Sequence, residues 1–190
     1  NALAIASLEI CCREVFEWGE MQTDPNFGNY LVRLGDGVST PDQIILLDFG
    51  AVRDFPEDLL TLARTLTKAS VLRDRETLVS SMKGFSFFDE MGIENKKKIA
   101  EVCLLAVEPF TKLQDAPKET VTADGKYIWA KSNLHTRVLM QATKSAANRE
   151  FSVPPKELMF ISRKFIGAYT FMTVIDAKIY AYDIIEPFLK

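Results

Sequence analysis

The chain has 190 residues, of which 47% are hydrophobic and 26% are charged, a composition typical of one globular domain with a substantial core. Its formal net charge of −3 provides no broad basic surface, which argues against nucleic acid as a partner. Three cysteines and a single histidine form neither a disulfide framework nor a zinc-ligand spacing.

The first part of the chain predicts one helix followed by a β-hairpin. Apolar residues recur at intervals of three to five over residues 1–19, which predicts an amphipathic helix that Gly19 ends. Two short apolar runs, residues 30–34 and 44–47, flank a polar connection that contains glycine and proline. This pattern predicts two antiparallel strands joined by a turn.

The rest of the chain is helical in pattern. Helices are expected at residues 57–72, 76–83, 94–112, 126–148 and 156–182, with a break at the prolines of residues 151–155. The aromatic run at residues 85–88 favours core packing, with an exposed contact as the alternative. The longest charge-free apolar run, residues 165–175, is far shorter than the ~20 residues of a membrane span. The fold class predicted is mainly α with a small antiparallel β-hairpin.

Three polar residues lie around the predicted hairpin. Asn29 directly precedes its first strand and Asp48 directly follows its second, so both are expected at the open end. If Tyr30 faces Leu47, the two side chains lie about 5 Å apart, the spacing of cross-strand neighbours. An amide oxygen and a carboxylate at that separation can share one Mg²⁺ ion. Asp24, in the preceding loop, can curl back to present a second carboxylate.

This order of residues matches the template for phosphoryl transfer. An Asp, an Asn five residues later and a D-F-G after a further strand occur in kinases as H-R-D-x-x-x-x-N and D-F-G. Here they are Asp24, Asn29 and residues 48–50, which predicts a catalytic loop at 21–29 and a metal-binding motif at 48–50. The alternative is that each residue only forms a turn or caps a strand. That alternative explains each residue separately but not their convergence.

At these residues the chain resembles a known family. Q-T-D-P-N-F-G-N at residues 22–29 and L-L-D-F-G-A-V-R at residues 46–53 are similar to the UbiB-type atypical kinases of ubiquinone biosynthesis, in the mitochondrial branch. C-R-E-V-F-E at residues 12–17 and R-D-R-E-T at residues 73–77 extend the resemblance. It implies that residues 1–190 form the C-terminal lobe of a protein-kinase-like fold, with residues 57–190 as its helical remainder.

The resemblance also implies a chemistry. Asp24 takes the catalytic position, and Asn29 and Asp48 bind Mg²⁺ and, through it, ATP. The implied location is mitochondrial, and the implied partners are a nucleotide and ubiquinone-biosynthesis proteins. A membrane surface is a further candidate partner, on the basis of the lysines at residues 96–98. The nucleotide-covering N-terminal lobe is expected outside this chain, because no V-A-I-K or glycine-rich phosphate loop is present. We therefore expect the chain alone to be inactive.

Two other functions remain open. Aminoglycoside or choline kinase-type phosphotransferases share the hairpin and the D-x-x-x-x-N spacing. However, Q-T-D at residues 22–24 and D-F-G-A at residues 48–51 differ from their usual motifs. A non-catalytic pseudokinase scaffold is favoured by the missing lobe and disfavoured by the three polar residues. An ordinary protein kinase is disfavoured, because a helix is predicted directly after residue 56 and no A-P-E follows.

Overall fold

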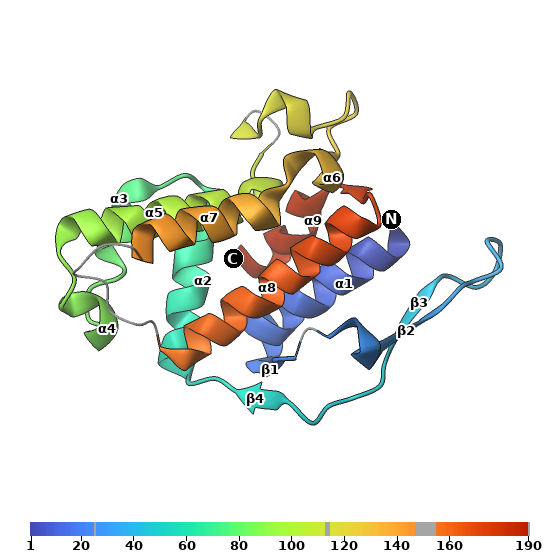
Figure 1. Cartoon of the computed structure of the whole chain (residues 1–190), viewed down its shortest axis with the longest axis horizontal. Coiled ribbons are helices and arrows are strands. Elements are labelled where there is room, and N and C mark those ends of the chain that lie inside the picture. Colours follow the sequence, from blue (N-terminus) through green and yellow to red (C-terminus); the bar gives the residue numbers. More distant parts are fainter. Residues whose placement is uncertain (25, 113–114, 147–154, 190) are drawn as a thin grey trace.

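The computed structural model describes residues 1–24, 26–112, 115–146 and 155–189. The described part is mainly helical, with small antiparallel strand pairs, as the sequence predicts. Figure 1 shows a body of packed helices from which one β-hairpin projects. The longer helices are α1 (Ala2–Arg13), α2 (Glu57–Val71), α5 (Ile93–Ala106), α7 (Leu134–Ala146) and α8 (Lys156–Val174). The shorter ones are α3 (Arg75–Ser80), α4 (Ser86–Asp89), α6 (Trp129–Ser132) and α9 (Ala181–Ile185).

The strands form three separate two-stranded pairs in the described residues. The projecting hairpin, β2 (Tyr30–Arg33) with β3 (Gln43–Leu46), is the predicted one. The sequence analysis missed the other two pairs. They are β1 (Glu20–Gln22) with β4 (Val52–Asp54) and β5 (Tyr127–Ile128) with β6 (Lys178–Ile179). These strands are only two or three residues long, too short for an alternating pattern to identify them.

Four predicted helices are shorter than expected, and the one predicted at 76–83 ends at Ser80 as α3. The helix predicted at 94–112 ends at Ala106, and the one at 126–148 begins with a strand and turns at Asn133 (φ 46°) before α7. The helix predicted at 156–182 ends at Val174, where Asp176 (φ 48°) turns the chain into β6. Most of the break predicted at residues 151–155 lies outside the described residues. The turn at Asp176 leads directly into β6, which pairs with β5 from much earlier in the sequence.

One core cluster supports the site directly. It joins Val15 to Met21 of β1, and to Phe55, Leu59 and Leu60 around the start of α2. α1 continues into a π-helical turn, Glu14–Trp18, which Gly19 ends with φ 71°. A Cβ at Gly19 would lie 2.9 Å from Leu60 Cδ1, so glycine suits both the backbone and the close approach of α2. The start of β1 is therefore fixed against α2.

Two further clusters form the helical body. In one, the fully buried Trp129 packs edge-on against Tyr127, with ring centroids 5.2 Å apart, and contacts Tyr169 of α8. The other contains Leu78 and the buried Phe88, so the aromatic run at residues 85–88 packs in the core as favoured. No helix in the described part of the chain has both the length and the apolar character that a membrane crossing requires.

Candidate phosphoryl-transfer site

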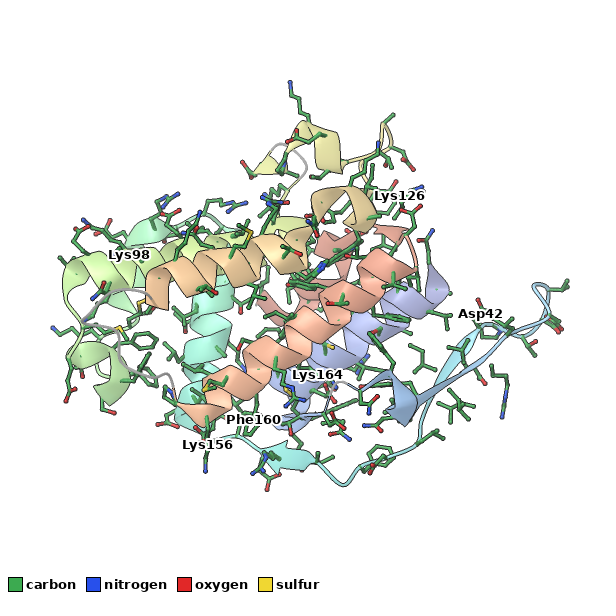
Figure 2. The ribbon with its side chains drawn as sticks, in the orientation of Figure 1. Asp42, Lys98, Lys126, Lys156, Phe160 and Lys164 are labelled. Carbon is green, nitrogen blue, oxygen red and sulfur yellow. The ribbon has the colours of Figure 1, made fainter. Side chains whose placement is uncertain are left out.

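β1 and β4 bring the two predicted motifs together. Gln22 pairs with Val52 in the register of these strands, and Thr23 donates to the carbonyl of Ala51 from both its backbone N–H (3.0 Å) and its hydroxyl (2.8 Å). The first residues of the predicted catalytic loop thus lie beside the segment after D-F-G. The Arg53 guanidinium lies 4.9 Å from the Phe160 ring centroid, which connects β4 to α8. Figure 2 labels Phe160 on α8.

The side chain of Gln22 joins the two motifs. Its Nε2 donates to the carbonyl oxygen of Asp48 (2.6 Å), and its Oε1 accepts from the backbone N–H of Asp24 (3.1 Å). Gln22 is only 7% exposed, so the amide acts in a largely buried place. Typical kinases have His at this position. Here the glutamine amide bonds to the backbone of both motifs.

Asp24 and Asn29 contact each other across the predicted catalytic loop. Asn29 Nδ2 donates to Asp24 Oδ2 (3.0 Å), and both residues are half-buried. A short 3₁₀ turn, Phe27–Asn29, shapes the loop, and Asn26 Oδ1 caps it by accepting from the Gly28 N–H (2.9 Å). The loop therefore curls back as expected.

The hairpin register differs from the expectation by one residue. Tyr30 pairs with Leu46, whereas the sequence analysis paired it with Leu47. Leu47 instead donates its N–H to the carbonyl of Asn29 (2.9 Å), which extends the pairing past the strand end. Asp48 thus follows one position beyond the cross-strand partner of Asn29. The convergence of Asp24 and Asp48 rests on Gln22 and on β1–β4, and not on the hairpin alone.

The side chains at this site are suitable for a hard cation. Asn29 uses its amide nitrogen on Asp24, which leaves its oxygen as the group for a cation. Asp48 is exposed. Within the described residues its Oδ1 accepts one backbone N–H, that of Gly50 (2.7 Å), whereas a carboxylate offers about four lone-pair positions. Within the described ranges no group of three or more His, Cys, Asp or Glu forms a protein-only metal site. A kinase-type Mg²⁺ site needs only such oxygens together with phosphate, so the residues fit the ion.

A buried ion pair that the sequence analysis did not identify lies under the loop. Lys164 Nζ lies 2.9 Å from Glu14 Oε2 and 3.0 Å from Glu14 Oε1, and the two side chains are 5% and 6% exposed. Burial raises the pKa of Glu14, although Lys164 opposes this. For Lys164, burial lowers the pKa but is outweighed by Cys11, Glu14 and Tyr30, so the net shift is upward. Figure 2 labels Lys164 midway along α8, beside α1.

The sequence did hold a signal for Lys164. It lies three residues after Ile161 and four before Ala168, inside the apolar stripe predicted to face the core. A charged residue within such a stripe indicates a buried partner. Its neighbour Arg163 lies close to the site as well, with its guanidinium 3.8 Å from Asp24 Oδ1, although the Arg163 side chain is 61% exposed.

Comparison with known proteins agrees with the geometry. The family described as "ABC1 atypical kinase-like domain" matches residues 1–82, which include the loop, the hairpin and D-F-G. Over these residues the chain is similar to the ABC1 atypical kinases. The similarity confirms the resemblance found in the sequence, and the kinase-like domain fits the fold predicted.

Similarity to three named proteins extends through most of the chain. The chain is 25% identical over 181 residues to "Atypical kinase COQ8B, mitochondrial" of Danio rerio. It is 26% identical over 181 residues to "Atypical kinase COQ8, mitochondrial" of Saccharomyces cerevisiae. It is 29% identical over 174 residues to "Probable serine/threonine-protein kinase abkA" of Dictyostelium discoideum. The matches cover 94%, 95% and 90% of this chain but only 26%, 33% and 29% of the relatives. The chain thus spans a quarter to a third of their length.

Proposed function

We propose that this chain is the C-terminal lobe of an atypical kinase or ATPase that binds Mg-ATP and supports ubiquinone biosynthesis in mitochondria. The observation that carries the proposal is the Gln22 amide, which bonds to the backbone of both Asp24 and Asp48. Two motifs that are weak separately are therefore held side by side. The similarity to atypical kinases named COQ8 and mitochondrial supports the pathway and the location.

Each polar residue has a distinct role in this proposal. Asp24 orients the phosphoryl acceptor and takes its proton, and the Asn29 amide holds the Asp24 carboxylate in place through the 3.0 Å hydrogen bond. The oxygens of Asn29 and Asp48 hold the Mg²⁺ ion. When bound, the ion neutralises charge on the nucleotide phosphates, which counts most in a reaction with a loose, charge-rich transition state.

A second lobe completes the site in this proposal. Large apolar side chains around the motifs are exposed, including Phe27 (52%), Leu31 (54%) and Phe49 (61%). Exposed apolar side chains gathered in one region indicate a surface that another body covers. We assign it to the nucleotide and to the N-terminal lobe of the same protein. The chain alone is then expected to bind Mg-nucleotide weakly and not to turn it over.

The test is the effect of ATP on thermal stability with and without Mg²⁺. Ligand at ten times its Kd stabilises the native state by about 1.4 kcal/mol, a shift of about 3–6 °C for a chain of this size. The native chain should show the shift only with Mg²⁺, and Asp48→Asn should abolish it. Asp183→Asn, an exposed change on α9, is the matched control and should leave the shift intact. A shift that is independent of Mg²⁺, or that survives Asp48→Asn, would refute the metal site.

A further inference from the structure

We propose that Lys164 of α8 is a positioning residue for the phosphoryl-transfer loop, which it holds at both ends. The proposal rests on the proposed function. It adds a residue far outside residues 1–82, the part of the chain that matches the ABC1 family. No motif contains Lys164, so only the folded structure reveals its relation to the loop.

The first end of the loop is held through Gln22. Lys164 Nζ donates to the carbonyl oxygen of Gln22 (3.1 Å), and Glu14 Oε1 accepts from the N–H of Gln22 (3.2 Å). The buried ion pair therefore binds both backbone groups of this residue. Its side chain binds the backbone of Asp24 and Asp48, so a shift of Gln22 would displace both motifs together.

The second end is held through Tyr30, the residue directly after Asn29. Its hydroxyl lies 3.5 Å from Lys164 Nζ, the longest contact in the group. The phenol is half-buried, between the loop and the cation of α8. One ammonium group thus contacts residues on either side of Asp24 and Asn29.

The energetics favour a role in geometry over a role in stability. Moving an ammonium and a carboxylate out of water costs about as much as their attraction returns, so a buried pair contributes little net stability. Lys164 nevertheless has three partners arranged around the loop: Glu14, Gln22 and Tyr30. A pair selected only for packing would be replaced by apolar residues of similar size at no loss. Fixing the loop is the effect that an apolar pair could not reproduce.

The test separates geometry from stability by a double substitution. Lys164→Met alone would leave a buried carboxylate without its cation and destabilise the whole fold. In Glu14→Gln with Lys164→Met no charge is stranded, and the new amide oxygen can still accept from Gln22. The matched control is Glu108→Gln with Arg137→Met, which removes a second ion pair (2.7 Å) in which the carboxylate is buried, away from the loop.

Two measurements are made on both double variants and on the native chain. Amide hydrogen exchange at Thr23, Asp24 and Asn29 reports the order of the loop, and Mg-ATP titration reports affinity. Relative to the native chain, the Glu14/Lys164 variant should accelerate exchange at these amides at least tenfold more than exchange at the amides of α5. Its Mg-ATP affinity should be weaker by about tenfold, or about 1.4 kcal/mol. The control should change neither by more than about twofold, at the precision of such comparisons.

The outcomes are distinguishable. Unchanged loop exchange, exchange that rises equally in α5, or unchanged affinity despite faster exchange would each overturn the role of Lys164. If the native chain binds no Mg-ATP at all, the proposed function fails, and loop exchange alone then decides whether Lys164 orders the loop.

Discussion

Replacing Gln22 with leucine isolates the link between the two motifs. Leucine is close to glutamine in size but lacks both amide atoms, so Asp48 loses a donor to its carbonyl and Asp24 loses an acceptor for its N–H. Each hydrogen bond contributes about 0.5–1.5 kcal/mol net, or about 1–3 kcal/mol for the two. The fold should survive this loss, because both bonds are only partly buried and the apolar cluster that holds β1 against α2 is unchanged.

Ligand binding should be more sensitive than stability. If the two hydrogen bonds favour the conformation in which both motifs lie together by about 2 kcal/mol, their loss lowers the affinity for Mg-ATP by up to about 30-fold. Nuclear magnetic resonance titration measures the affinity, and urea unfolding measures the stability. Gln43→Leu is the control, because Gln43 is exposed and accepts only a long 3.4 Å bond from Arg33. Equal affinities for native and Gln22→Leu chains would refute the reasoning that this amide couples the motifs.

Three further predictions concern stability. Gly19→Ala should destabilise the fold in urea more than Gly37→Ala, because both glycines have positive φ (71° and 72°) but only Gly19 is approached closely by α2; equal losses would contradict this. Burial raises the pKa of the Cys11 thiol from 9.0 to about 12. The free energy of unfolding should therefore keep the contribution of the neutral thiol below pH 9 and fall as pH rises from 9 toward 12, and this fall should be smaller in Cys11→Ala. Hydrogen bonds, first from the Ser39 hydroxyl and then from backbone N–H groups, lower the pKa of Asp36 below 3.8. The order of the hairpin tip should therefore persist at and above pH 3.8 and disappear only under stronger acid, which amide exchange at the tip measures.

Local features of the site could be predicted from sequence. The five-residue spacing from Asp24 to Asn29 spans one turn of loop, so their contact depends on nearby residues alone. The hairpin followed from two short apolar runs. Its register could not be fixed to the residue, since one more hydrogen bond from Leu47 to Asn29 shifts the pairing without changing the pattern of apolar residues.

Long-range features could not be predicted. Glu14 and Lys164 are 150 positions apart, and no spacing rule relates residues on two helices whose packing is unknown. The β5–β6 pair also depends on contacts across the chain, as does the turn at Asp176 that ends α8 early. In each case tertiary packing decided between conformations that the local sequence left equally open.

The contact between Lys164 and Gln22 spans 142 positions and so has a consequence for how the protein is made. On the ribosome, the residues of both motifs emerge long before α8 does, so the loop lacks its ammonium support until α8 follows. A contact between residues so far apart in sequence forms slowly, because closing the loop between them costs entropy. Until it forms, apolar segments stay exposed without their packing partners. Nascent chains that stall before residue 164 are therefore expected to hold a loose nucleotide loop and to depend on chaperones until α8 is released.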